Sequence, residues 1–188
     1  MIRNILIIIF SLVFLASCGK KDTTQNDKGK FKVGLVFDVG GRGDKSFNDA
    51  AYRGLEKAKQ ELGIEFEYIE PGPGADREAA LRQFSSRKDI SVIFGIGFIF
   101  TDEITKIAVE FPDKKFGCVD YTVDPAKTIP QNLLALEFRE DEGSFLVGAI
   151  AGLLTKTNKV GFVGGMESPL IKKFQVSYEA GVKYVNPG

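Results

Sequence analysis

The sequence predicts an α/β protein built on a doubly wound parallel sheet. After residue 30, short apolar runs alternate with longer amphipathic stretches. This alternation of strands with helices is typical of βαβ units, whose helices cover both faces of a parallel sheet. The composition agrees, because 44% apolar and 27% charged residues are typical of a globular chain rather than a disordered one.

The first strand and helix are well marked. Residues 32–37 form an apolar run that predicts a buried strand, and apolar residues recur between 47 and 62 at the spacing of one helix face. Ser46 and Asp49 form a predicted capping box at the start of this helix. Gly63 is a predicted stop just after it.

Similar units follow along the chain. Turn residues such as Pro71 and Gly72 separate the apolar runs. The further strands of the sheet are expected at 65–69, 90–95, 115–119 and 133–138. The further helices are expected at 76–87, 102–111 and 141–154.

The start of a second strand-and-helix unit is predicted near the end of the chain. Residues 159–165 repeat the strand-then-glycine pattern of residues 32–41, and Ser168-Pro169 predicts a helix with Pro at its first position. One strand and one helix cannot bury a core of their own. We therefore expect a first α/β lobe over 31–156, and over 157–188 a hinge and the start of an incomplete second lobe.

Residues 1–17 are typical of a secretory signal peptide. The basic Arg3 precedes an apolar run, 5–15, which is too short to span a bilayer core of about 30 Å as a helix. The run ends in Ala16-Ser17-Cys18, which resembles the bacterial lipobox. Cys18 is therefore expected to be lipidated, with palmitate among its acyl chains.

The predicted lipid determines where the protein works. Residues 18–30 comprise the lipidated Cys18 and a polar tether with no apolar residue after the cysteine. Several acyl chains hold a protein stably at a membrane surface. We expect an extracytoplasmic protein, anchored by lipid to the cell membrane or the outer membrane. Cys118 is then the only other cysteine, and its apolar setting predicts a buried thiol.

Composition excludes several classes of function. The chain has no His, so it cannot build a Ser-His-Asp triad, a Cys-His dyad or an HExxH zinc site. Its 25 basic residues balance its 25 acidic ones, which argues against a nucleic-acid partner. We expect neither a cofactor nor a metal, and no enzymatic activity.

The segment after the first strand, 38–48, is rich in glycine and acids and invites several interpretations. A P-loop needs Gly where Asp44 stands, and Asp44 would repel phosphate. A dinucleotide fingerprint lacks its third Gly, and an EF-hand fails because Gly40 and Arg42 stand where acidic ligands are needed. The tripeptide Arg42-Gly43-Asp44 occurs too often by chance to indicate adhesion.

Ligands of doubly wound sheets bind at the carboxyl ends of the strands. Asp38 follows the first strand there, and Phe47 with Asn48 opens the next helix. Phe47 either stacks on a flat ligand or belongs to the core. Asp120 is either an acceptor for ligand hydroxyls or an ordinary loop acid. Further candidates for the same cleft are Gly97 and Phe98.

Together these segments resemble the basic membrane protein family of lipoproteins, the nucleoside-binding components of ABC importers. The matching motifs are Phe37-Asp38-Val39-Gly40-Gly41, Asp44-Lys45-Ser46-Phe47-Asn48, Gly95-x-Gly97-Phe98, Val119-Asp120, Glu142-Gly143-Ser144-Phe145-Leu146-x-Gly148 and Gly161-Phe162-Val163-Gly164-Gly165-Met166-x-x-Pro169-Leu170-Ile171. The resemblance runs from about residue 32 to residue 188.

The resemblance implies a type I periplasmic-binding-protein fold with two lobes that close on a purine nucleoside such as inosine, guanosine or adenosine. It implies that Phe47 stacks on the base, that Asp38 and Asn48 bind the base, and that Asp120 binds the ribose. The implied partners are an ABC permease and its ATPase. Family members are about twice as long in their folded part, so we expect a truncated second lobe here.

Two alternatives remain open. The same fold also serves surface lipoproteins that act as adhesins or ligand sensors, since fold alone does not decide function. An extracytoplasmic nucleoside hydrolase would need clustered carboxylates or a metal. The dispersed Asp38, Asp44 and Asp120 give that alternative little support.

Overall fold

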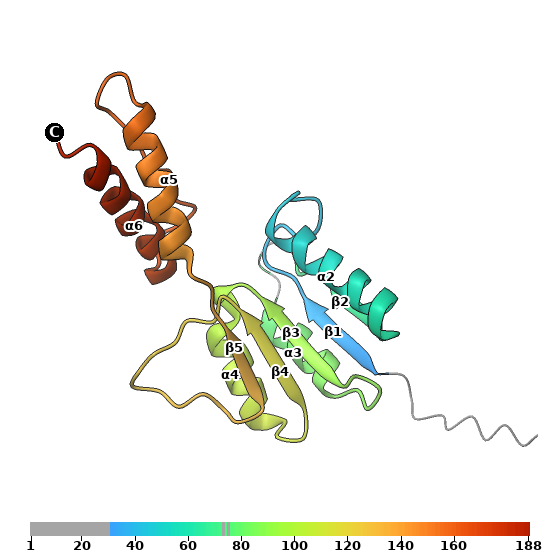
Figure 1. Cartoon of the computed structure of the whole chain (residues 1–188). Helices are drawn as coiled ribbons and strands as arrows, with labels where there is room; N and C mark the ends of the chain where they lie inside the picture. Colours follow the sequence, from blue (N-terminus) through green and yellow to red (C-terminus); the bar gives the residue numbers. More distant parts are fainter. Residues whose placement is uncertain (1–30, 73, 75) are drawn as a thin grey trace, which may run out of the picture. The chain divides into compact units, whose positions relative to one another are not determined.

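The computed structural model describes residues 31–72, 74 and 76–188. The predicted signal peptide, Cys18 and tether lie outside the described residues. The strands are β1 (Lys32–Val36), β2 (Glu65–Ile69), β3 (Val92–Ile96), β4 (Lys115–Val119) and β5 (Leu133–Leu136) (Figure 1). The helices are α2 (Phe47–Leu62), α3 (Arg77–Ser85), α4 (Thr101–Glu110), α5 (Glu140–Leu154) and α6 (Pro169–Val185), with a 3₁₀ turn, η1 (Phe98–Phe100).

The predicted parallel sheet is confirmed. Its strand order is β2-β1-β3-β4-β5, and every neighbouring pair is parallel. This is the 2-1-3-4-5 order of doubly wound sheets, in which the chain reverses its direction of winding between β1 and β3. The carboxyl ends of those two strands therefore mark the point where such folds bind ligands.

Helices cover both faces of the sheet, as expected. Leu55 of α2 is buried with alternate residues of β1, including Val33 and Leu35, on one face. The helices α3 and α4 lie on the other face, where Phe84 and Ile104 are buried against Ile93 of β3 (Figure 1). The expected burial of Cys118 is also confirmed, since its side chain is inaccessible in β4.

The helix boundaries confirm two predicted caps and correct a third. Gly63 adopts the left-handed conformation, with φ 68°, and Ser168 accepts a hydrogen bond from the amide of Ile171. The side chain of Ser46 makes no capping hydrogen bond, so the predicted capping box is wrong. The carboxylate of Asp44 caps α2 instead, because its two oxygens accept hydrogen bonds from the amides of Ser46, Asn48 and Asp49.

The helix expected at 141–154 forms as α5, but it packs along α6 (Figure 1). Small residues allow the close approach. A side chain at Gly148 or Gly181 would overlap the backbone of the other helix. The hydroxyl of Ser144 donates a hydrogen bond of 2.6 Å to the carbonyl of Phe174.

The strand expected near 159–163 does not form, and residues 155–168 carry no helix or strand. A strand needs a neighbour for its backbone hydrogen bonds, and no described strand lies beside this segment. The lobe boundary at residue 156 stays a prediction. Residues 31–188 form one compact unit in the structure. No described helix is long and apolar enough to span a bilayer.

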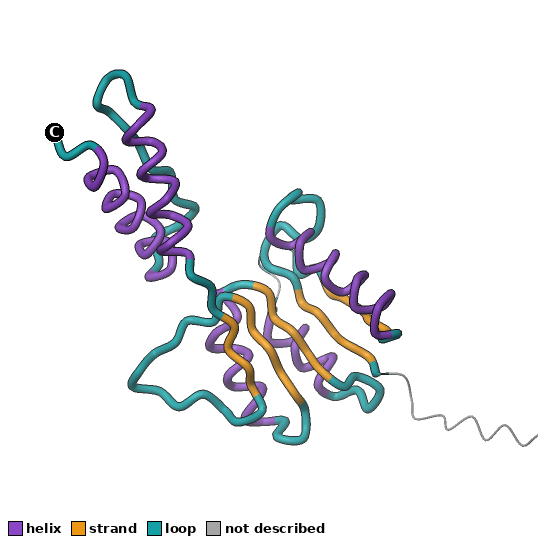
Figure 2. The backbone as a smooth tube through the Cα atoms, in the orientation of Figure 1, coloured by secondary structure: helices purple, strands orange, loops and turns teal. Residues whose placement is uncertain are grey.

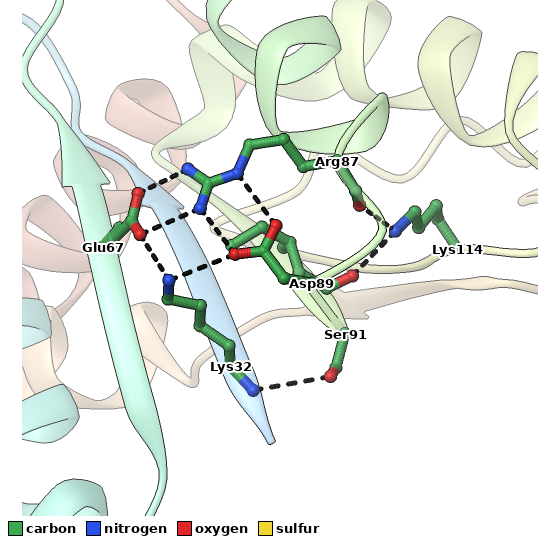
Figure 3. Close-up of polar contacts among 7 residues, drawn as sticks. Lys32, Glu67, Arg87, Asp89, Ser91 and Lys114 are labelled. Atoms are coloured by element: carbon green, nitrogen blue, oxygen red, sulfur yellow. Dashed lines mark hydrogen bonds and ion pairs between the residues drawn. The ribbon is translucent and has the colours of Figure 1, made fainter. Parts of the chain in front are cut away.

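A network of charges ties the amino end of the sheet together (Figure 3). Glu67 on β2 pairs with both Lys32 on β1 and Arg87 in the segment after α3. Asp89 contacts the same two cations, at 3.1 Å and 2.7 Å. Lys114 donates to the carbonyl of Arg87. The network therefore joins β1 and β2 to the approach to β3.

Candidate ligand-binding site

Three of the predicted site residues meet at the carboxyl edge of the sheet. Asp38, Gly97 and Asp120 follow β1, β3 and β4, which are adjacent strands. Figure 2 shows the loops that leave these parallel strands at one edge of the sheet. A Cβ atom built on Gly97 would lie 2.7 Å from Oδ2 of Asp38. The amide of Gly97 donates to the carbonyl of Val119, next to Asp120, at 3.1 Å. The sheet thus brings residues far apart in the chain to one place.

Burial makes both carboxylates costly to ionise. Partial burial raises the pKa of Asp38, and the amide of Val39 and the charge of Arg77 only partly oppose that effect. Burial also raises the pKa of Asp120, to which Glu140 and Asp38 add repulsion. Hydroxyl or amide donors of a ligand would compensate for the water that these carboxylates have lost.

The backbone at Asp120 is strained. Its φ of 57° lies in the left-handed region, which few residues other than glycine adopt. Its amide donates to the carbonyl of Leu136 on β5 at 2.8 Å, which holds the chain in this turn. Strain of this kind costs about 1–3 kcal/mol and is concentrated at functional sites.

Phe47 and Asn48 are the first two residues of α2, but their surroundings differ. Phe47 is half-buried against the apolar cluster under α2, so it is neither a full core residue nor a free one. Asn48 is only 3% exposed, and its Oδ1 accepts a hydrogen bond from the amide of Asp38 at 3.1 Å. No hydrogen bond from its Nδ2 to a described residue is found, so this donor is a candidate for a contact with a ligand.

The structure also places Phe98 at this edge. It opens η1 directly after Gly97 and is half-buried. The hydroxyl of Thr101 donates to its carbonyl at 2.7 Å, which fixes the backbone of the turn. The ring is therefore held near Gly97 by a short, hydrogen-bonded segment.

A hollow of about 160 Å³ lies beside Asp120. Its lining includes Thr122, Glu140 and Lys173, and the last two form an ion pair of 2.7 Å. Sites for small molecules usually measure about 300–1,000 Å³, so this hollow would take only part of a ligand. Sequence reasoning missed Glu140 and Lys173, because only the packing of α5 and α6 brings them to Asp120.

Arg77 is another residue that sequence reasoning missed. It opens α3, and its guanidinium donates to Oε1 of Glu103 at 2.7 Å. Its Nε is buried and has no partner among the described residues. Its charge opposes the rise in the pKa of Asp38. The sequence offered one signal for Arg77, which is its position in the first turn of a helix that follows a strand.

The site combines acidic, amide and aromatic side chains. Among the described residues, no group of His, Cys, Asp or Glu is arranged to hold a metal ion. Burial raises the pKa of the Cys118 thiol to about 12, so it stays protonated and unreactive at neutral pH. The site offers two carboxylates, the amide of Asn48 and half-buried aromatic rings.

Comparisons with known proteins bear on the family and the fold of this chain. A family model described as "ABC transporter substrate-binding protein PnrA-like" matches residues 31–188. Among solved structures, a solute-binding protein of an ABC transporter system from Aeropyrum pernix superposes with a TM-score of 0.76 at 33% identity. The match covers 84% of this chain and 44% of that one.

Curated relatives show the same partial coverage. The CD4+ T-cell-stimulating antigen of Listeria monocytogenes is 38% identical, over 96% of this chain and 52% of the relative. Basic membrane protein A of Borreliella burgdorferi is 39% identical, over 97% and 52%. An uncharacterised lipoprotein of Pyrococcus furiosus is 39% identical, over 91% and 42%. The chain spans about half the length of the curated relatives it matches.

Proposed function

The chain belongs to the family of PnrA-like substrate-binding proteins of ABC transporters, and from that membership we propose that it captures purine nucleosides outside the cytoplasm. Inosine, guanosine and adenosine are the ligands we expect. The captured nucleoside is handed to a permease that an ATPase drives. Proteins of this family are a solute-binding class, and the proposed role involves no catalysis.

The observation that carries the proposal is the meeting of Asp38, Gly97 and Asp120 at the point where the sheet reverses its winding. A nucleoside has a flat apolar base with a polar edge and a ribose with hydroxyl donors. Carboxylates suit those donors, and a glycine lets the ligand approach the backbone closely. Phe47, the residue before Asn48, would supply the ring on which the base stacks.

A lipid anchor on Cys18 fits the same role. Relatives of this chain carry the name lipoprotein. A tethered receptor stays close to the permease and loads it from a local pool of bound ligand. We propose closure of two lobes around the nucleoside as the event that the permease detects, with α5 and α6 moving as one body because they pack closely together.

The test is calorimetric titration of inosine, guanosine and adenosine into the lipid-free protein expressed from its complete reading frame. We expect saturable heat with at least one of them. Phe47→Leu keeps an apolar side chain against the cluster under α2 but removes the aromatic face. It should weaken binding about 10-fold to 100-fold, because stacking on a base contributes about 1–3 kcal/mol.

Leu62→Ala is a matched control, since Leu62 ends the same helix with 76% of its surface exposed. It should bind as the unmodified protein does. Absence of heat with all three nucleosides would contradict the proposal and favour a surface sensor or adhesin on the same fold. Equal affinity of the Phe47→Leu variant would remove Phe47 from the site but leave the nucleoside assignment intact.

A further inference from the structure

We propose that Arg42 is a positioning residue, which latches the loop between β1 and α2, residues 38–46, onto the edge strand β2. The latch holds Asp38 and Phe47 in place before a ligand arrives. The inference rests on the proposed function for what the loop binds. The latch itself is a property of the free protein and is testable without any ligand.

The side chain of Arg42 is held by two tyrosines. Its Cζ lies 3.6 Å from the centroid of the Tyr52 ring on α2 and 5.5 Å from that of Tyr68 on β2. Its Nη1 donates to the hydroxyl of Tyr68 at 3.1 Å. The two rings meet edge to face, 5.6 Å apart. A guanidinium stacks on one ring and bonds to the next in a way that an ammonium group cannot reproduce.

The backbone of the loop is fixed to the same strand end. The amide of Arg42 donates to Oε2 of Glu70, the residue after β2, at 2.9 Å. The same carboxylate lies so close to Gly41 that a side chain there would overlap it. Gly41 has a φ of 60°, so its backbone conformation also favours glycine. One residue therefore carries both a side-chain and a backbone attachment to β2.

The other hydrogen bonds of the loop are local. Asp49 accepts from the amides of Gly43 and Lys45, both at 2.9 Å. Asp44 accepts from the amides of Ser46 and Asn48. These contacts shape the loop and cap α2, but they do not join the loop to a strand. Among the described residues, Arg42 thus makes the hydrogen bonds that fix the loop to β2.

The position of the latch explains how it affects the site. Asp38 is the first residue of the loop, and Asn48 follows the loop on α2. The amide of Asp38 donates a hydrogen bond to Oδ1 of Asn48, which joins the two. If the loop between them is loose, ligand binding must order it, and that ordering weakens the affinity. A loop that is already latched to β2 has lost this conformational freedom before the ligand arrives, so binding does not carry the entropic cost of ordering it.

The experiment compares Arg42→Ala with Arg53→Ala in the protein from its complete reading frame. Arg53 is a matched control, an exposed arginine on α2 for which no hydrogen bond, ion pair or ring contact with a described residue is found. Hydrogen exchange of the backbone amides is followed without ligand, and the Kd for inosine is measured by calorimetry. We expect Arg42→Ala to speed exchange at residues 39–46 at least 10-fold, with β1 and β3 unchanged, and to weaken inosine binding about 10-fold.

Two further variants separate the latch from a general loss of stability. Arg42→Lys keeps the charge but not the planar stack, so it should restore only part of the protection. Tyr68→Phe removes one hydroxyl and should speed exchange in the loop about 3-fold without lowering Tm. If Arg42→Ala unfolds the whole chain, the exchange rates of residues 39–46 in the Tyr68→Phe variant test the latch instead.

Unchanged loop exchange in Arg42→Ala would overturn the latch. Faster loop exchange with an unchanged Kd for inosine would overturn its role in positioning the site. If the unmodified protein binds none of inosine, guanosine and adenosine, the proposed function fails. The exchange data then still decide whether Arg42 latches the loop.

Discussion

The carboxylate of Asp38 lies against Gly97, at a distance that leaves no room for a side chain. A Cβ atom on Gly97 would stand 2.7 Å from Oδ2 and 3.1 Å from Cγ of Asp38. The backbone of Gly97 has φ 109° and ψ 151°, a region that only glycine adopts readily. The glycine therefore permits both the turn after β3 and the position of the acid after β1.

Gly97→Ala should weaken both ligand binding and stability. The new methyl group would push the Asp38 carboxylate out of the crevice, and we expect inosine affinity to fall at least 10-fold. The unfavourable backbone should also cost about 1–3 kcal/mol of the free energy of unfolding. Calorimetry measures the first effect, and urea denaturation measures the second.

Gly54→Ala is the matched control for that substitution. A Cβ atom at Gly54 meets no other atom within 4 Å, and the residue lies inside α2. Alanine should stabilise the helix by up to about 1 kcal/mol and leave inosine affinity as it is. Full binding by the Gly97→Ala variant would show that Asp38 does not need its present position to bind a nucleoside.

Asp120→Asn should stabilise the protein at neutral pH while it weakens binding. Burial, Glu140 and Asp38 raise the pKa of Asp120 above its ordinary value of 3.8. A carboxyl with a raised folded pKa favours folding below its unfolded pKa, and this contribution is lost as the pH rises through the folded pKa. At pH 7 the ionised group therefore opposes folding, and asparagine removes that penalty.

The pH dependence identifies the cause. Asparagine also adopts the left-handed φ of 57°, and any difference in backbone strain between the two residues is the same at every pH, so only the ionisation penalty changes with pH. The gain in Tm should be present at pH 7 and vanish near pH 3, where the aspartate of the unmodified protein is protonated. Asp113→Asn, at an exposed turn, should show no such gain. A lower Tm for Asp120→Asn at pH 7 would contradict the assigned penalty.

Much of the fold follows from local patterns in the sequence. All five strands of the sheet form within a few residues of their predicted places, because the inner strands are mostly apolar runs and the edge strand β2, EFEYI, alternates polar with apolar residues. The strand expected near 159–163 has the same local pattern but no neighbour in the described residues. Strand formation depends on that neighbour as much as on the pattern, which is why this prediction failed.

The candidate site, too, was predictable only in part. Asp38, Gly97 and Asp120 were predictable, because position after a strand is visible in the sequence. The roles of Arg42 and Lys173 depend on which surfaces meet in three dimensions, and no local pattern reveals that. Their partners, Tyr68 and Glu140, are 26 and 33 residues away in the chain.

Cys18→Ser should release the protein from the membrane. The lipid is expected on the thiol of Cys18, and serine offers no thiol for acylation. In cells that express the full reading frame, we expect the unmodified protein in the detergent phase of a phase-separation assay and the variant in the aqueous phase. Cys118→Ser, which alters only a buried thiol, should remain in the detergent phase. Detergent partitioning of the Cys18→Ser variant would contradict lipidation at this residue.

Glu67→Gln should destabilise the fold without affecting the ligand site, because the charge network lies at the amino end of the sheet (Figure 3). Hydrogen bonds from Arg87 and Lys32 lower the pKa of Glu67 from 4.5 to about 2. A carboxylate with a lowered folded pKa contributes stability above its unfolded pKa and loses it as the pH falls through the folded pKa. The contribution is on the order of 1 kcal/mol, since the pairs are partly exposed and screened by solvent.

The free energy of unfolding from urea denaturation at pH 7, 4 and 3 tests this expectation. The difference between the unmodified protein and Glu67→Gln should be full at pH 7 and shrink as the pH falls below 4. Glu61→Gln is the control, because its pair with Lys57 is long, at 3.9 Å, and highly exposed. That variant should lose almost nothing at any pH. An equal loss in both variants would mean that the joined network contributes no more than an isolated surface pair, although it links β1, β2 and the approach to β3.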